Sequence, residues 1–534
     1  MSSHGPSSSP RTSERDAPQT YRRSETPPLP HAERRRVTVL FGGLTRAHER
    51  LIEGGWQGLG YTVKALPTAD NQSLAIGKEF CSRGMCNPAY YTIGNLLKYL
   101  LQLRRAGVPE IEERFVYLTA GSCGPCRFGM YEAEYRRALA QAGFPRFRIL
   151  LVQQDQGLEQ NAAEGVFVAD RDFLQALVRA LMVGDLLNEL GYALRPYEVE
   201  PGAIDAALAE GRRWLYWALR DRQSPLPALR RLRKRLDEVP IDYARVRPRV
   251  RIVGEFWAQT TEGDGNYHLA RWLESEGAEV MVEPVGTWIE YLLWNRIQRS
   301  RARRTLPPEG GERHSPLLEL KLRMGQILFD SVYNSYRAAL GFRTEPIASL
   351  DTLARYAHEY FDTRIRGGEA FLEVAKTVFA VRHRRAHMVV SVKPFGCMPS
   401  TQSDGVQVRV VSDHPEALFI PVETSGDSEV HVKSRVQMLL FEARERATEE
   451  FDRVARDLGL RELLADAQAR ERLPMPPTMH PLPRRERGTA ANYLWWLARP
   501  AALRTLPLPS ERLTALLCRA GLRRTAGDAP RDAS

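Results

Sequence analysis

Short apolar segments alternate with helix-like stretches along residues 37–152 of the chain. The apolar segments are predicted strands, and they lie at Val37–Phe41, Tyr61–Leu66, Phe115–Thr119 and Phe147–Val152. Between the second and third, apolar residues recur at helical spacing, at Ile93, Leu96, Leu97, Leu100 and Leu101. Strands that alternate with helices in this way are typical of a parallel, doubly wound sheet.

A second strand–helix–strand unit begins at Val250 and ends in a predicted strand at Glu279–Val282. The two units share an aromatic residue, a glycine and a strand valine at near-equal spacing, namely Trp56, Gly60 and Val63, then Trp272, Gly277 and Val280. Further strands are predicted at Met388–Val392 and Ala417–Val422, before a long helix from about Glu429 to Leu458. The pattern predicts an α/β fold with two or more Rossmann-like or flavodoxin-like parallel-sheet lobes and helical insertions.

The same pattern divides the chain into segments. Residues 1–36 form a basic arm rich in Ser, Pro and Arg with no hydrophobic period, which predicts disorder. The first α/β lobe spans residues 37–160 and carries two cysteine loops; the second starts at 246–298 and is completed at 387–458, with a third cysteine loop. The remaining segments are helical regions at 161–245 and 316–386, a linker or insertion at 299–315, and a Pro- and Arg-rich tail at 459–534. We expect this tail, with its short Trp495-Trp496 helix, to be peripheral.

A net charge of +11 over 534 residues is compatible with a nucleic-acid-binding protein. Whether it indicates one depends on where along the chain the charge lies. Residues 1–36 hold seven Arg and four acidic residues, and residues 471–534 hold eleven Arg and five acidic residues, so the rest of the chain carries only +2. The basic charge therefore belongs to the ends, and we expect no nucleic-acid partner. The chain has no apolar run of the ~20 residues needed for a membrane helix, and no apolar signal core near its start. We expect a cytoplasmic protein without integral membrane association.

The cysteines give the clearest chemical signal. Five of the six lie in three loops that are rich in glycine and proline: Cys81 with Cys86, Cys123 with Cys126, and Cys397. Loops that follow the strands of an open parallel sheet gather at its carboxyl edge, where ligands bind. Thiolates at helix N-termini are favoured as metal ligands. We therefore predict a metal or redox site, whereas Cys518, alone on an apolar helix face, is interpreted as an ordinary thiol.

Two other interpretations of these residues stay open. A four-cysteine zinc site usually draws on two close pairs within one compact module, whereas Cys397 belongs to a remote lobe, which favours a cofactor at a lobe interface. Cys123-Gly124-Pro125-Cys126 is identical to the thioredoxin redox motif, although Ser122 stands where thioredoxins usually have Trp.

Among the histidines, His383 and His387 have metal-ligand spacing, but the flanking arginines favour a solvated basic face.

Several segments resemble the activase-related family of 2-hydroxyacyl-CoA dehydratases, that is, the 2-hydroxyglutaryl-CoA dehydratase activator-like iron–sulfur proteins. Gly77–Cys81, Cys86–Pro88 and Thr92–Leu97 are similar to its first cysteine region, Gly124–Tyr131 to its second signature and Lys393–Ser400 to its third. Arg251–Glu255 and Pro284–Tyr291 are similar to the strand and the following segment of its second lobe. The resemblance covers roughly residues 37–456.

The resemblance implies a [4Fe–4S] cluster between stacked α/β lobes. Cys86, Cys126 and Cys397 match the three cysteine positions of the family and are the expected metal ligands. Cys81 and Cys123 depart from the family pattern, so the fourth ligand is one of these two, or the fourth iron is open to water or substrate. Arg127 and Lys393 are then expected to tune the cluster potential.

The resemblance also implies partners. Large relatives carry an ATPase of the sugar-kinase/heat-shock/actin class in the same chain, and we find no such phosphate loops before Val37. We therefore expect the ATPase in a separate chain, in a stand-alone form of the family. The expected function is low-potential electron transfer or reductive activation. Alternatives are a dehydratase- or reductase-like catalyst acting on an acyl-CoA, a metal-stabilised scaffold without catalytic activity, and a thiol–disulfide oxidoreductase using Cys123 and Cys126.

Overall fold

The computed structural model describes residues 36–122, 126–153, 171–304, 315–365, 368–466, 468 and 472–500. Nearly all of the N-terminal arm, most of the predicted linker, Cys123 and Cys518 lie outside the described residues. The expectations for those segments stay predictions.

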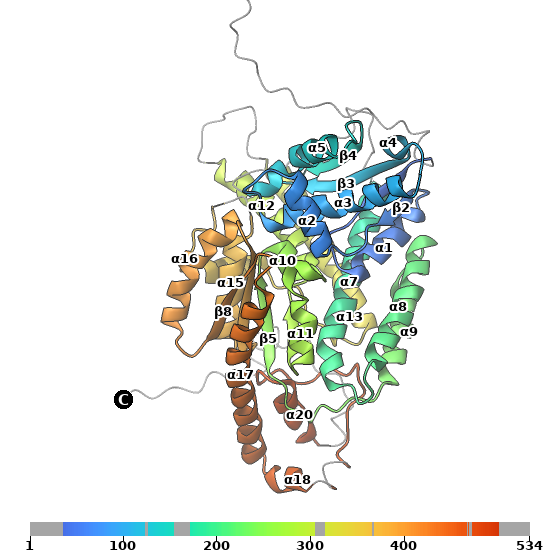
Figure 1. Ribbon diagram of the computed structural model, residues 1–534. Helices are drawn as coiled ribbons and strands as arrows, with labels where there is room; N and C mark the ends of the chain where they lie inside the picture. The colour runs from blue at the N-terminus through green and yellow to red at the C-terminus, as the bar shows by residue number, and fades with distance from the viewer. Residues whose placement is uncertain are drawn as a thin grey trace, which may run out of the picture.

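Two parallel sheets of four strands each organise the fold, as the alternating pattern predicts (Figure 1). The first has the order β2-β1-β3-β4 and comprises β1 (Thr38–Phe41), β2 (Thr62–Ala65), β3 (Phe115–Gly121) and β4 (Arg148–Gln153). The second has the order β6-β5-β7-β8 and comprises β5 (Arg249–Gly254), β6 (Glu279–Val282), β7 (Met388–Pro394) and β8 (Leu418–Thr424). The predicted α/β fold with two Rossmann-like lobes is confirmed.

The two lobes share one topology, which supports the repeat seen in the sequence. In each sheet the first strand in chain order lies between the second and the third. Val63 pairs with Val39 in the first sheet, and Val280 pairs with Val250 in the second. Gly60 and Gly277 both adopt a left-handed backbone, with φ of 85° and 86°, just before these paired strands.

Helices cover both faces of the first sheet. Alternate strand residues such as Val39 and Val116 pack with α1 (Arg46–Gln57) and α7 (Arg171–Leu194), whereas Leu40 and Tyr117 pack on the opposite face. The helices of that opposite face are α2 (Asn71–Phe80), α3 (Asn87–Arg105) and α5 (Tyr131–Gln141). The short helices α4 (Ile111–Arg114) and η2 (Arg127–Met130) precede β3 and α5.

A helical layer extends the core of the first lobe toward the second. Its members are η3 (Arg195–Tyr197), α8 (Ala203–Arg220), α9 (Leu226–Asp237), α12 (Val285–Ala302) and α13 (Pro316–Ala339). The predicted linker at 299–315 starts too early, because α12 continues through Ala302. Among the described helices, none has the length and apolar character required to cross a bilayer.

One face of the second sheet is apolar, and the other combines buried polar side chains with a small apolar cluster around Val253 and Val389. One face of the sheet packs against α11 (Leu269–Ser275) and α17 (Glu429–Asp457), beside α10 (Phe256–Thr260) and η4 (Asp264–Asn266). The other face lies under α15 (Ala370–Arg382) and α16 (Met398–Asp413) (Figure 1), and α14 (Leu350–His358) packs against α15. Buried polar side chains line this second face: Glu373, Lys376, Thr377, Ser391, Ser400, Ser403 and Gln407. The sequence pattern missed α16, because its residues are mostly polar or β-branched and show no apolar stripe.

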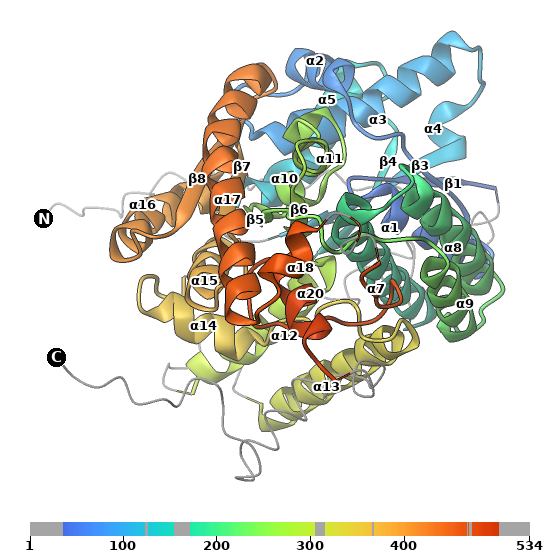
Figure 2. The same cartoon turned by 90° about the horizontal axis from the view of Figure 1, so that it is seen from below.

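The C-terminal segment is not peripheral, so that expectation is wrong for the residues described here. The helices α18 (Arg461–Ala465) and α20 (Thr489–Leu497) follow α17, and α20 packs beside it (Figure 2). Met479, Tyr493 and Trp496 are buried in the same core as α7, α8 and α9. This segment therefore braces the helical layer against the second lobe.

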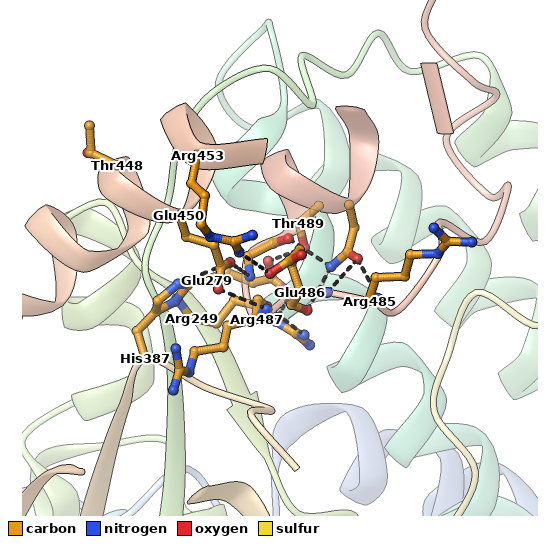
Figure 3. Close-up of polar contacts among 12 residues, drawn as sticks. Arg249, Glu279, His387, Thr448, Glu450, Arg453, Arg485, Glu486, Arg487 and Thr489 are labelled. Carbon is orange, nitrogen blue, oxygen red and sulfur yellow. Dashed lines mark hydrogen bonds and ion pairs between the residues drawn. The ribbon is translucent and has the colours of Figure 1, made fainter. Parts of the chain in front are cut away.

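Polar contacts fix the C-terminal segment at the amino edge of the second sheet (Figure 3). Glu450 of α17 accepts hydrogen bonds from the N–H of Gly488 (2.7 Å) and of Arg487 (3.3 Å). His387 Nε2 lies 3.5 Å from the same carboxylate and is buried, so the solvated basic face predicted for it is wrong. His387 lies outside any histidine pair, since His383 instead bonds Tyr356.

We expect Trp496→Ala to lower the free energy of unfolding by roughly 3–5 kcal/mol, because it leaves a cavity in a shared core. The matched control is Trp217→Ala, since Trp217 is 51% exposed whereas Trp496 is 4% exposed. Urea unfolding of both variants provides the test. Equal stability of the two would show that the C-terminal segment does not belong to the core.

We expect the Glu450 carboxylate to make the free energy of unfolding smaller in acid. Burial acts to raise its pKa, but His387 and the N–H groups of Gly488 and Arg487 prevail and lower it from 4.5 to about 2. A carboxylate with a lowered pKa stabilises the fold above its unfolded pKa, and that contribution is lost as the pH falls from 4.5 toward 2. Urea unfolding should show Glu450→Gln roughly 2–3 kcal/mol less stable at pH 7, with the difference shrinking toward pH 3. The exposed neighbour Glu449, changed to Gln, should have no such effect.

Candidate functional site

The two lobes meet where α3 begins, at Asn87. Its backbone N–H donates to the carbonyl of Phe395 (3.2 Å), and its buried side-chain amide donates to the carbonyl of Thr424 (2.7 Å). Phe395 follows β7 and Thr424 ends β8, and Phe395 N–H itself donates to Thr424 (2.9 Å). Asn87 thus holds the first cysteine region of lobe one against the carboxyl edge of the second sheet.

Gly396 allows the two cysteine regions to approach closely. Its φ of 77° is left-handed, and a Cβ there would lie 3.0 Å from Arg127 Nη1 and 3.6 Å from the Cα of Cys86. Arg127 in turn donates to the carbonyl of Gly84 (2.5 Å), which ties the second cysteine loop to the first. All three cysteine loops therefore converge at this seam between the lobes.

Two of the cysteines occupy the same local position. Cys86 is the N-cap of α3 and Cys397 is the N-cap of α16, and each is followed two residues later by a proline, Pro88 or Pro399. Proline suits the first turn of a helix because the N–H it lacks has no partner within the helix. At the positive end of a helix of this length, negative charge on a thiolate or a bound group is stabilised. Cys126 is the N-cap of the short helix η2, which leads into Tyr131 and α5.

The negative charge of Glu255 contributes to a raised pKa in three thiols, those of Cys86, Cys126 and Cys397. Burial and then Glu255 raise the pKa of Cys397. Burial, Glu369 and Glu255 raise the pKa of Cys126 to about 12, against the N–H of Phe128. Burial and Glu255 likewise raise the pKa of Cys86, whose Sγ lies 3.0 Å from the hydroxyl of Tyr131. The structure therefore brings together Cys86, Cys126 and Cys397, the three predicted metal ligands.

Cys81 lies in different surroundings. It ends α2 and is buried, and burial followed by the charge of Glu134 raises its pKa to about 12. Arg137, which is ion-paired with Glu134, partly opposes that rise. The charged groups that shift its pKa, Glu134 and Arg137, both belong to α5 and not to the loops of Cys126 and Cys397. Cys123, the remaining candidate, lies outside the described residues.

Sequence reasoning missed the acidic side chains at this edge. Glu255 is the N-cap of α10 and its carboxylate accepts from Ala258 N–H (2.8 Å), while Glu369 accepts from Phe256 N–H (2.7 Å). Glu373 accepts from the hydroxyls of Ser400 (2.9 Å) and Ser403. Burial is the main cause that raises the pKa of Glu255 to about 8 and of Glu373 to about 7. The sequence does contain one signal for Glu255 as a site residue: it directly follows the first strand of the second lobe, at the edge that bears Cys397.

Arg127 and Lys393, expected to tune a cluster potential, have internal partners. Arg127 bonds the Gly84 carbonyl, and Lys393 pairs with Asp404 of α16. Burial lowers the pKa of Lys393, against the attraction of Glu423. Both cations thus help fix the loops that carry Cys126 and Cys397.

The side chains that are available as ligands determine which metal centre this site can bind. Within the part of the chain that the structure describes, no group of three or more His, Cys, Asp or Glu side chains is arranged to hold a metal ion. A four-iron cluster makes a different demand, because each cysteine binds a different iron and the ligands stand around the cluster. Three thiols that come from separate loops and meet at one seam fit such a cluster in their chemistry, as soft ligands for iron–sulfur.

No family model matches the chain, and a search of curated proteins finds no match. The functional argument therefore rests on the residues of the seam and on the resemblance of its motifs.

We expect Asn87→Ala to loosen the seam. Loss of the side-chain bond removes one of the two donors to the Thr424 carbonyl, which keeps the Phe395 N–H, so the change should cost about 0.5–1.5 kcal/mol in urea unfolding. Asn334→Ala, on the partly exposed helix α13, is the control. Alkylation followed by mass spectrometry should show faster reaction of Cys86 and Cys397 in the Asn87 variant, with Cys81 unchanged. Equal acceleration at all three would indicate general unfolding and contradict a local role of Asn87.

Proposed function

We propose that this chain is a [4Fe–4S] electron-transfer protein related to the activators of 2-hydroxyacyl-CoA dehydratases. Cys86, Cys126 and Cys397 hold the cluster at the seam between the two lobes. When bound, the cluster supplies one-electron transfer at low potential. Free thiols of this kind persist in a reducing compartment, so a cytoplasmic location belongs to the proposal.

One observation carries the proposal. Three cysteines from three distant segments meet at the carboxyl edge of the second sheet, where Asn87 N–H bonds the Phe395 carbonyl and Gly396 lies against Cys86 and Arg127. Unreactive core thiols would have no reason to occupy N-cap positions in loops that a buried asparagine and a left-handed glycine hold together. Ligands bind at this edge of open α/β sheets in general.

The surface beside the cysteines suits a protein partner. Met130, Phe395 and Met398 are large apolar side chains that are 61%, 56% and 42% exposed, and they flank Cys126 and Cys397. Exposed apolar residues that gather next to a redox site favour docking of another protein. The partner in the proposal is the separate ATPase of the sugar-kinase/heat-shock/actin class.

A catalyst with an open iron is the second candidate. The half-buried Glu255 and the buried Glu369 and Glu373 favour it, because raised pKa values make carboxyl groups available for acid–base work near neutral pH. Turnover of a 2-hydroxyacyl-CoA with a chemical reductant and no ATPase would favour this candidate over the relay.

Single Cys→Ser variants test the proposal under anaerobic purification. Cys86→Ser, Cys126→Ser and Cys397→Ser should each lose most of the iron and acid-labile sulfide, together with the electron paramagnetic resonance (EPR) signal of the reduced protein. Cys81→Ser is the matched control and should keep all three. Iron and sulfide assays with EPR spectroscopy provide the measurement.

Other outcomes separate the alternatives. A colourless wild-type protein with stoichiometric zinc would overturn the cluster and support the metal-stabilised scaffold. Dithiol–disulfide exchange that is lost in Cys123→Ser and Cys126→Ser but kept in Cys397→Ser would support the oxidoreductase. Full iron content in all three seam variants would contradict the ligand assignment.

A further inference from the structure

Helix α13 exposes an apolar stripe to solvent. The stripe consists of five large apolar residues on one face of the helix, namely Leu317, Leu320, Met324, Ile327 and Leu328. They are 56–65% exposed, whereas Phe329, Tyr333 and Tyr336 of the same helix are buried in the core of the helical layer. The stripe therefore takes no part in the packing that holds α13 in place.

The position of α13 leaves this stripe accessible to another molecule. The helix packs against α7, α9 and α12, and it lies along the margin of the molecule in the view from below (Figure 2). Residues three and four positions apart are neighbours on a helix surface, so the five side chains form one continuous patch. Single exposed apolar residues are normal on a protein surface, but a continuous patch marks an interaction site.

The spacing of the stripe indicates the shape of its partner. Leu317, Leu320, Met324 and Ile327 recur at alternating intervals of three and four residues. This is the spacing of the a and d positions through which two helices pack side by side. A second helix laid along α13 would bury all of these side chains at once.

Gly325 gives independent support for a helix as the partner. It borders the stripe, between Lys321 and Leu328 on the helix surface. A Cβ added at Gly325 would have no neighbour within 4 Å among the described residues outside its own stretch of helix, so packing within the chain does not require glycine. Glycine in a helix interior is destabilising relative to alanine. The close approach of another helix provides a reason for it.

The charges beside the stripe favour a protein over an anionic membrane as the partner. Arg301 and Arg304 both pair with Glu319, and Arg323 lies 3.3 Å from Asp351. Helices that bind a membrane surface instead offer their cations to lipid headgroups. These three arginines are already paired within the chain, and the stripe beside them is apolar.

We propose that the α13 stripe is the interface between two copies of this chain. Two-fold symmetry is the commonest arrangement of homo-oligomers, and it pairs a surface patch with itself. An antiparallel pair of α13 helices centred near Arg323 sets Leu317 of one copy opposite Leu328 of the other. In the middle of the pair, Leu320 of one copy lies opposite Met324 of the other. Large apolar side chains are thereby matched along the whole stripe.

The area of the stripe is sufficient for such a dimer. Side chains with this exposure present roughly 500 Å² of apolar surface, at the upper end of the range for the largest patch on a monomer. Two stripes placed face to face would bury about 1,000 Å², which is the area that a specific interface requires. The stripe lies outside the cysteine loops, so this inference goes beyond the proposed function and does not depend on it.

Sedimentation velocity of the full chain tests the dimer. At micromolar concentration the wild type should sediment with twice the mass of a single chain. Met324→Glu places two carboxylates near the two-fold axis and should weaken dimerisation at least about 100-fold, because like charges in an apolar interface repel. The matched control is Met438→Glu, which changes a 72% exposed methionine of α17 and should leave the dimer intact. Circular dichroism should show the same helix content in both variants.

Cross-linking tests the antiparallel arrangement. A short bis-maleimide should join Leu317→Cys to Leu328→Cys when the two variants are mixed and exchange subunits. Neither variant should be joined to itself, because equivalent residues lie roughly 16 Å apart along the helix axis. Wild-type protein treated in the same way shows the reaction of the native thiols. Cross-linking of each variant to itself but not to the other would overturn this arrangement.

Three results would overturn the interface as a whole. The first is a monomeric wild type, and the second is a dimer that Met324→Glu leaves intact. The third is a monomeric wild type that binds phosphatidylglycerol vesicles and loses this binding in Met324→Glu, which would assign the stripe to a membrane surface. Iron and sulfide content should be equal in Met324→Glu and the wild type, so the failure of this inference is distinguishable from failure of the proposed function.

Discussion

The hydrogen bonds of Asn87 across the seam are the constraint on which the site depends. They join the first turn of α3 in one lobe to the ends of β7 and β8 in the other, through the carbonyls of Phe395 and Thr424. The Thr424 carbonyl keeps a donor in Phe395 N–H, but a shift of the lobes would deprive the buried Asn87 side-chain amide of this acceptor. Because the bonds involve the residue after Cys86, the distance between the cysteine loops is set by backbone geometry, with Gly396 allowing the close approach.

In the second lobe, the sheet face that leads to this seam buries polar and charged side chains, and their burial costs free energy of folding. Its strands and helices α15 and α16 enclose Glu373, Lys376 and Ser403 where the first lobe encloses apolar side chains. Such a layer is stable only when each group is satisfied, as Glu373 is by Ser400 and Ser403. Among the residues that the structure describes, no Lys or Arg forms an ion pair with Glu255, whose charge helps to raise the pKa of the three seam thiols. The polar layer and the unpaired carboxylate therefore point to the same functional edge.

At the opposite edge of the second sheet, polar contacts hold the C-terminal segment in place. There the C-terminal segment closes over the amino ends of β5 and β6, where Arg249 pairs with Glu279 (2.9 Å) and Thr489 also bonds that carboxylate (Figure 3). Trp496 and Tyr493 then bury the segment in the core of the helical layer. Fixing one edge in this way leaves the carboxyl edge as the place where loops gather and ligands bind.

The sequence by itself determined the α/β class, the positions of the strands and the loops that carry the cysteines. Buried strands, helical periodicity and turn residues such as Gly60 and Gly277 depend on residues that are close in the sequence, so they can be recognised from the sequence alone. It could not determine that Cys86, Cys126 and Cys397 share Glu255 while Cys81 does not, because that depends on how one lobe is set against the other. The burial of Trp496 and His387 also escaped the sequence, since a Pro- and Arg-rich segment or a run of arginines gives no sign of what will pack over it. Only the tertiary structure decided these points, because burial and charge proximity arise between segments that lie far apart along the chain.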